Sequence, residues 1–210
     1  MEFNIWLAFV AASTTLLIIP GPTILLVLSY ALSQGRQVAL ATAAGVALGD
    51  FIAMTASLMG LGALVLASSE LFISLKWIGA AYLIYLGIKL FRSASSASIS
   101  GIGANAALSA RGVFSHAATV TALNPKSIAF FIAFVPQFMR PENPLLPQFI
   151  ILIATFVGLA TLNTLAYALM ADCMRARIER PSVIAGLSRF GGCTLIAMGI
   201  MTATFRRISA

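Results

Sequence analysis

The sequence predicts an all-α membrane protein of six transmembrane helices, built as two inverted three-helix repeats in which helices one and four are broken. The composition indicates a lipid environment, because 60% of the 210 residues are hydrophobic and only 9% are charged, against about 25% in soluble domains. Apolar runs recur at the length of about 20 residues that a bilayer-spanning helix needs. Prolines interrupt two of these runs, at matching places in the two halves.

Six apolar stretches bounded by charged or turn residues define the expected spans. The first stretch lacks the basic region that opens a signal peptide, and its apolar run continues to Leu32, so we expect it to be retained. The last stretch is the weakest, because Arg189 leaves only residues 190–205 free of charge, and five spans are the alternative. The stretches lie at 4–32, 38–67, 71–91, 113–138, 147–171 and 183–205.

A linker rich in Ser, Ala and Gly at 92–112 divides the chain into a first repeat at 1–91 and a second at 113–210. Basic residues favour the cytoplasmic side of a membrane, and they gather on the linker's side of the expected spans. We therefore expect a cytoplasmic linker and two periplasmic termini. The linker's side holds Arg36, Lys89, Arg92, Arg111, Arg175, Arg177, Arg180 and Arg189, and the opposite side holds Lys76, Arg140, Arg206 and Arg207.

The net charge and the length exclude two classes of function. The net charge is +7, but the basic residues form no extended face, so we expect no nucleic-acid partner. Six spans with short connections use nearly the whole chain, which leaves no room for a soluble catalytic domain. The sequence does not indicate whether the protein forms a homo-oligomer.

The first span contains Pro20-Gly21-Pro22-Thr23 near its middle, and the fourth contains Asn124-Pro125-Lys126. Proline removes a backbone donor and clashes with the preceding turn, so both helices should kink or unwind there. Unpaired backbone at membrane depth is tolerated only where protein or a water-filled cavity satisfies it. Two broken helices at matching places in inverted halves indicate a transporter's binding site. The alternative is a pair of ordinary kinks, because Pro and Gly are common in membrane helices.

Asp50 lies near the middle of the second span, and Lys126 lies as deep in the fourth. An Asp at the centre of a membrane helix costs about 3 kcal/mol on insertion scales and marks ion or proton pathways. Asp50 could form a structural salt bridge with Lys126, or it could carry the proton. Burial favours the neutral form of a carboxyl group and a nearby cation favours the carboxylate, so a pair that breaks and reforms during transport satisfies both hypotheses.

The expected site offers groups for both ends of an amino acid. Free amides at the start of the half-helix near Pro22 suit a carboxylate, and Asp50 suits an ammonium group or a proton. Asn163, in the middle of the fifth span, is either a site residue or a polar contact between helices. The predicted substrate-binding residues are Pro20, Gly21, Pro22, Thr23, Asn124, Pro125, Lys126 and Asn163.

The chain also resembles the LysE/RhtB family of bacterial amino-acid exporters over nearly its whole length. The motifs that carry the resemblance are Pro20-Gly21-Pro22, Gly45-x3-Gly49-Asp50, Lys76-x2-Gly79-Ala80-x-Tyr82-Leu83-x3-Gly87, Asn124-Pro125-Lys126 and Phe134-Val135-Pro136-Gln137-Phe138. The resemblance implies efflux of amino acids or their derivatives from the cell across the inner membrane, driven by proton exchange. Gly45 and Gly49, four residues apart, are expected to pack helices closely, and so is Gly79.

Three other functions fit the sequence less well. Export of a metal ion or another small cation lacks a cluster of His, Cys or carboxylate ligands. A membrane enzyme lacks a catalytic set beyond Ser127 beside Lys126. A passive channel is the remaining alternative. We expect neither a cofactor nor a bound metal, and we expect the partners to be an amino-acid solute, protons and the lipid bilayer.

Overall fold

The computed structural model describes residues 1–19, 21–67, 69–93, 109–140, 142–178 and 181–204. All regular structure in these residues is helical, which confirms the predicted all-α class. In chain order it comprises α1 (Phe3–Ile18), α2 (Pro22–Gln34), the 3-10 turn η1 (Gly35–Val38), α3 (Ala39–Ala67), α4 (Ser69–Ser93), α5 (Ala110–Ala122), α6 (Pro125–Ala133), the 3-10 turn η2 (Val135–Phe138), α7 (Leu145–Ile178) and α8 (Pro181–Thr204).

Both predicted interruptions are present. The first separates α1 from α2 with a bend of 56°, and the second separates α5 from α6 with a bend of 44°. Proline opens the helix after each break, at Pro22 and at Pro125, where its missing amide costs no helical hydrogen bond. The sequence thus stops one helix and starts the next within a few residues.

Within the described residues, three helices are long and apolar enough to cross a membrane, and up to five spans result if each bent pair counts as one. The three are α3, α4 and α7, which cover the predicted second, third and fifth spans. The bent pairs α1–α2 and α5–α6 cover the first and fourth. The helix α8 covers the predicted sixth stretch but is not among these candidates.

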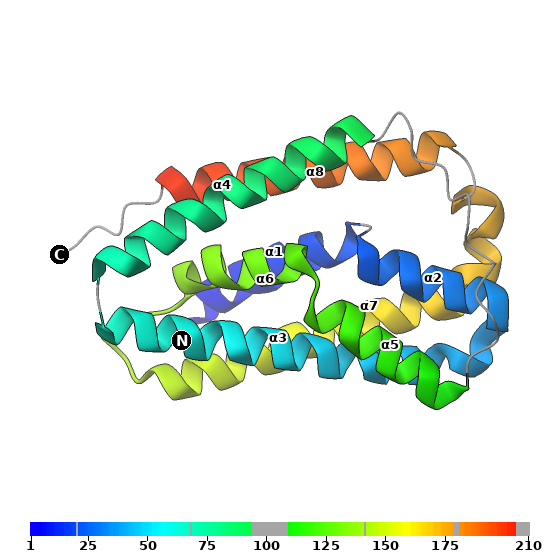
Figure 1. Cartoon of the computed structure of the whole chain (residues 1–210), viewed down its shortest axis with the longest axis horizontal. Helices are drawn as coiled ribbons and strands as arrows, with labels where there is room; N and C mark the ends of the chain where they lie inside the picture. Colours follow the sequence, from blue (N-terminus) through cyan, green and yellow to red (C-terminus); the bar gives the residue numbers. More distant parts are fainter. Residues whose placement is uncertain (20, 68, 94–108, 141, 179–180, 205–210) are drawn as a thin grey trace.

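The helices run along one long axis (Figure 1). The helix α4 lies beside α8, and α3 packs against α5 and α7. The pair α1–α2 runs in the opposite direction to α5–α6, and the same holds for α3 and α7 and for α4 and α8. The most extensive helix contacts join the first half of the chain to the second. Residues 94–108 of the predicted linker lie outside the described residues.

Glycines allow the closest of these helix contacts. A Cβ atom at Gly45 would lie 2.4 Å from the carbonyl oxygen of Phe114, and one at Gly49 would lie 2.6 Å from that of Ala118. The backbones of α3 and α5 therefore touch directly, as small residues permit. Gly79 brings α4 to α6 in the same way, where a Cβ atom would lie 2.6 Å from the Cβ of Ala133.

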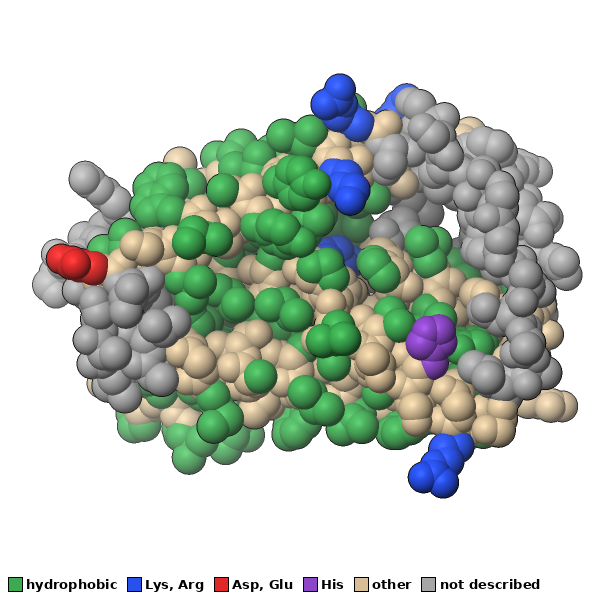
Figure 2. Space-filling view, viewed as in Figure 1, with side chains coloured by type: hydrophobic (Ala, Val, Ile, Leu, Met, Phe, Trp, Pro, Cys, Tyr) green, Lys and Arg blue, Asp and Glu red, His purple; other side chains and the backbone are tan. Residues whose placement is uncertain are grey.

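The face of the molecule in Figure 2 is largely hydrophobic, with few Lys and Arg side chains. Large apolar side chains on several helices are exposed, including Leu40 on α3, Ile78 on α4 and Leu162 on α7. Because soluble proteins rarely expose apolar area on this scale, the surface agrees with a lipid environment.

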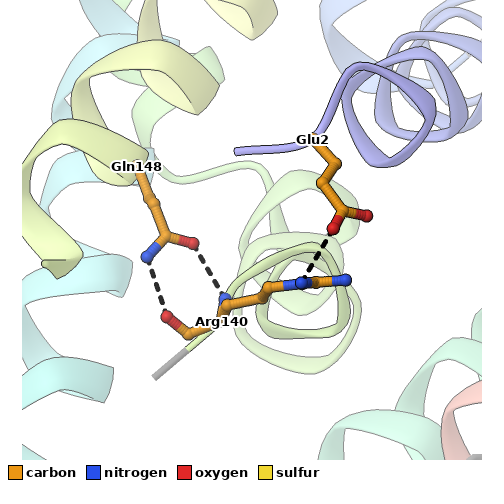
Figure 3. Close-up of polar contacts among 3 residues, drawn as sticks. All are labelled: Glu2, Arg140 and Gln148. Atoms are coloured by element: carbon orange, nitrogen blue, oxygen red, sulfur yellow. Dashed lines mark hydrogen bonds and ion pairs between the residues drawn. The ribbon is translucent and has the colours of Figure 1, made fainter. Parts of the chain in front are cut away.

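The N-terminus is fixed to the connection between η2 and α7 (Figure 3). Glu2 and Arg140 form an ion pair of 2.9 Å between exposed side chains. The Gln148 side chain accepts a hydrogen bond from the Arg140 amide and donates one to the Arg140 carbonyl, both at 2.8 Å. The chain start and this connection therefore share one end of the molecule, whereas α4 ends and α5 begins at the other.

Candidate functional site

A small cavity lies where the two breaks meet. Its free space is about 20 Å³, close to what one water molecule needs. Residues from α1, α2, α3, α6 and α7 and from both breaks surround it. They are Leu16, Leu17, Gly21, Thr23, Ile24, Val46, Asp50, Asn124, Lys126, Ser127, Ala160, Asn163 and Thr164.

Buried side chains of two different kinds flank this cavity. Towards the N-terminal end of the molecule, α1, α6, η2 and α7 contribute a cluster of six packed phenylalanines: Phe9, Phe130, Phe131, Phe134, Phe138 and Phe156. Towards the opposite end, smaller aliphatic residues pack together, among them Val27, Ala31, Ala39, Ala117, Ala168 and Ala171. The cavity residues of α7 lie between Phe156 and Ala168 in the chain, so the cavity lies between the two clusters along this helix.

The first break leaves the carbonyl end of α1 without partners inside its own helix, as every helix end does. Side chains of other helices supply them. Lys126 on α6 donates from Nζ to the carbonyls of Leu16 at 3.0 Å and Ile19 at 2.8 Å. On α7, Asn163 donates to the Leu17 carbonyl at 3.2 Å and Tyr167 to the Ile18 carbonyl at 3.1 Å. All four carbonyls from Leu16 to Ile19 are therefore paired.

The second break is closed by its own residues. The Asn124 side chain accepts a hydrogen bond from the Lys126 amide at 3.1 Å and so caps α6. The amides of Leu123 and Asn124 donate to the carbonyls of Thr119 and Thr121, which completes the end of α5. This local pairing is the standard role of Asn before a helix.

A direct polar contact joins the two breaks. Asn124 donates from Nδ2 to the Thr23 hydroxyl oxygen at 3.0 Å, and the Thr121 hydroxyl donates to the same atom at 3.4 Å. Thr23 lies in the first turn of α2, whose cap residue Gly21 provides no side-chain acceptor. The start of α2, with its partial positive charge, therefore borders the cavity without a side-chain cap.

Asp50 is 2% exposed and lines the cavity from α3. It interacts electrostatically with Lys126, but among the described residues it forms neither a hydrogen bond nor an ion pair. The salt bridge between Asp50 and Lys126, one of the two hypotheses from the sequence, is not formed here. The Lys126 ammonium instead binds the carbonyls of Leu16 and Ile19. The carboxyl group of Asp50 is thus buried beside the cavity and close enough to Lys126 to interact with its charge.

Comparison with known families decides the class of protein. Residues 14–205 match the model of the LysE type translocator family. The chain belongs to this family. Family membership makes it a transporter and not an enzyme.

Two relatives of this LysE-type translocator illustrate its similarity to efflux proteins. It is 34% identical to the homoserine/homoserine lactone efflux protein of Salmonella typhimurium, over 98% of this chain and 99% of that protein. It is 27% identical to a leucine efflux protein of Salmonella choleraesuis, over 80% of this chain and 78% of that protein. No solved structure matches the chain significantly.

The translocator brings most of the predicted site residues together. Gly21, Thr23, Asp50, Asn124, Lys126 and Asn163 all line the one cavity. Pro22 and Pro125 do not line it; they are exposed and begin α2 and α6. Pro20 lies outside the described residues. The two described prolines therefore fix where α2 and α6 begin, next to the cavity but outside its lining.

Four polar residues near the cavity were missed from the sequence as site residues. Ser127 and Thr164 line it, Thr121 contacts Thr23, and Tyr167 holds the end of α1. Helical spacing could have indicated Tyr167, which lies one turn after Asn163 on α7. The sequence indicated Ser127 only as a possible nucleophile beside Lys126, and Thr164 gave no signal, because hydroxyl side chains often bond within their own helix. In the described part of the chain, no three His, Cys, Asp or Glu side chains lie together as metal ligands would.

Proposed function

We propose that this translocator exports amino acids or amino-acid derivatives across the bacterial inner membrane in exchange for protons, with the cavity as its central site. One observation carries the proposal. A buried acid without a hydrogen-bonded partner among the described residues, Asp50, faces a cavity with polar and aliphatic lining where two broken helices meet. The named activities of the two relatives, efflux of homoserine or its lactone and of leucine, support this class of solute.

The groups around the cavity match the two charged ends of an amino acid. The start of α2 carries partial positive charge and lacks a side-chain cap, so its amides suit a carboxylate. Asp50 provides a negative charge for an ammonium group. Lys126 and the hydroxyl of Thr23 supply further donors. A charged acid and a charged base in one site let a zwitterion bind without a change in net charge.

The cavity is too small for any amino acid as it stands, because its 20 Å³ of free space holds about one water molecule. The phenylalanine cluster and the small aliphatic cluster lie on opposite sides of it along α7. We infer that transport opens these two clusters in turn. Alternating access around a central site requires that one side opens while the other is closed.

Proton exchange would use Asp50 as the carrier. A carboxyl group buried in a membrane protein is costly as an anion, so it is stabilised either by a proton or by a cationic ligand. A proton and the substrate ammonium would then compete for Asp50. Release of substrate on the acidic side and of the proton on the other follows from this competition.

We propose the six-span inverted repeat as the architecture of this transporter, with α8 as the sixth span and the halves 1–91 and 113–210 joined by a cytoplasmic linker at 92–112. The opposite directions of the corresponding helices support it. Basic side chains Lys89, Arg92 and Arg111 lie at the linker end, so both termini would be periplasmic. Active alkaline phosphatase fused after residue 210 would support this orientation, and an inactive fusion would contradict it.

Purified protein in proteoliposomes tests the proposed activity. Homoserine and leucine, each radiolabelled, should accumulate in vesicles with an acidic interior, and an ionophore that collapses the pH gradient should abolish the accumulation. Equal uptake with and without the gradient would indicate a passive channel. Uptake of neither solute, followed by a screen of amino acids for growth protection of a sensitive bacterium that also finds none, would contradict amino-acid export.

A further inference from the structure

The carbonyl end of α1 has the features of a cation site. It carries the partial negative charge of a helix C-terminus, and its residues Leu16 and Ile19 are each 1% exposed. Neutral donors, Asn163 and Tyr167, take the carbonyls of Leu17 and Ile18. The carbonyls of Leu16 and Ile19, three residues apart, are left for a charged group, and the Lys126 ammonium binds both.

Lys126 reaches this position from a different helix, and its side chain passes Gly21, which has no side chain of its own. It is the second residue of α6, whose N-terminal end disfavours a positive charge. Its ammonium extends past Gly21, where an added Cβ atom would lie 3.3 Å from both Cε and Nζ. The lysine is therefore held at its tip by α1, and its stem and tip occupy space that adjoins the cavity.

We propose that Leu16 and Ile19 form a site for a primary ammonium group, and that Lys126 is its tethered occupant, which the ammonium group of the transported solute replaces. The observed hydrogen bonds of 3.0 and 2.8 Å show that the two carbonyls accept an ammonium. Displaced Lys126 then meets the solute carboxylate, so the site gains one charge of each sign and stays balanced. An ammonium group in this position interacts with the charge of Asp50, as Lys126 does, so the competition with a proton at Asp50 is retained. The inference rests on the proposed function for the identity of the displacing solute.

Loss of the tethered lysine should turn the site into a binding site for free amines. Purified Lys126→Ala in detergent is titrated with methylammonium and propylammonium chloride while Tm is followed. We expect a saturable rise of roughly 3 to 6 °C at ten times the Kd. Tetramethylammonium, which has no N–H donor, should give no rise beyond that of NaCl. A rise of the same size with sodium or tetramethylammonium, or no rise with any amine, would overturn the proposal.

Two controls make the result specific to this site. Wild-type protein and Lys89→Ala, which loses an exposed lysine on α4, both keep Lys126 and should show no amine-dependent rise. If Lys126→Ala does not fold, the wild type is labelled with ¹⁵N at its three lysine side chains. The Lys126 ammonium resonance, identified by its loss in Lys126→Arg, should shift when a transported solute is added, and an unchanged resonance at saturation would contradict displacement.

The amine titration separates this inference from the proposed function. If Lys126→Ala binds amines but the wild-type protein transports no amino acid, the ammonium site is supported and amino-acid export is refuted. Export without amine binding would retain the transport proposal and refute the ammonium site.

Discussion

The two broken helices look alike in sequence but differ in what holds them. The break between α5 and α6 closes on itself, because Asn124 caps α6 and the amides of Leu123 and Asn124 complete α5. The break between α1 and α2 is held by distant residues, since three side chains from α6 and α7 take the α1 carbonyls. At α2, the cap residue Gly21 forms no side-chain hydrogen bond.

This difference assigns different roles to the breaks. A break that supplies its own partners can move as a rigid unit. A break whose partners come from other helices must reorganise whenever those helices shift, and its carbonyls are then open to a ligand. We therefore expect the first break to respond to substrate and the second to act as a fixed anchor, joined to the first by the contact between Asn124 and Thr23.

The largest effect should follow from Lys126→Met, which keeps the length of the side chain but removes the ammonium. Two carbonyls at the end of α1 lose their partner and Asp50 loses the nearby cation, and each buried polar group left without a hydrogen bond costs about 1 to 3 kcal/mol. We expect transport to fall by about 100-fold, or about 2.7 kcal/mol, and Tm to fall clearly. Initial rates in proteoliposomes measure the first and thermal unfolding in detergent the second, with Lys89→Met as the matched control. Wild-type transport rates in Lys126→Met would contradict the claim that the first break depends on side chains from other helices.

A smaller effect is expected when either of the two neutral donors to the α1 carbonyls, Asn163 or Tyr167, is replaced. Asn163→Leu and Tyr167→Phe each leave one carbonyl unpaired, and hydrogen bonds between membrane helices contribute about 0.6 kcal/mol on average and at most about 1.7. Each substitution should lower Tm by roughly 2 to 4 °C and slow transport several-fold. Tyr85→Phe, on the exposed face of α4, is the control. If neither variant differs from the control, the first break does not need its distant partners.

At the second break, loss of the hydrogen bond from Asn124 to Thr23 should cost less stability than loss of the cap that Asn124 provides to α6. Asn124→Ser keeps a good capping oxygen but cannot donate to Thr23, whereas Asn124→Ala removes both interactions. We expect Asn124→Ala to cost about 1 kcal/mol and Asn124→Ser to cost less than half of that. Thermal unfolding of the two variants side by side gives the difference. Equal losses would mean that the link to Thr23, and not the cap, stabilises this break.

The smallest effect is expected for Gly21→Ala. The extended backbone of Gly21, with φ −130°, accepts alanine, and the nearest atoms at 3.3 Å belong to the flexible end of Lys126. A slight displacement of the ammonium should raise the KM by about twofold, equivalent to about 0.4 kcal/mol, without a change in Tm. Gly60→Ala, where a Cβ atom meets nothing within 4 Å, should behave as wild type. A large fall in Tm would show that the Lys126 side chain cannot shift to make room for the added methyl group.

The sequence predicted the helices and both breaks because these features depend on local chemistry. Long apolar runs fix the spans of α3, α4 and α7, and proline with its neighbours fixes where α1 and α5 stop. The convergence of Asp50, Lys126 and Asn163 was also predictable, since each is a polar group in the middle of an apolar span and has to face the bundle interior.

The partners of these residues could not be predicted in the same way. Lys126 was expected beside Asp50 or a substrate carboxylate, because two opposite charges in one membrane protein suggest a pair. Two carbonyls at the end of α1, those of Leu16 and Ile19, bind the lysine instead, and backbone acceptors look the same at every position of a sequence. Tyr167 was missed because it lies near the end of the predicted fifth span at 147–171, where a tyrosine usually marks the interface.

Asp50→Asn gives the most direct test of the central claim, that a solute and a proton share the cavity between the breaks. The neutral amide cannot carry a proton and binds the solute ammonium less tightly than the carboxylate does. At high solute concentration the variant should therefore still exchange labelled for unlabelled solute across the vesicle membrane. It should not accumulate solute against a gradient when the vesicle interior is acidic, while the exposed-site control Glu142→Gln should accumulate it like wild type. Uphill accumulation by Asp50→Asn at the wild-type rate would contradict the account.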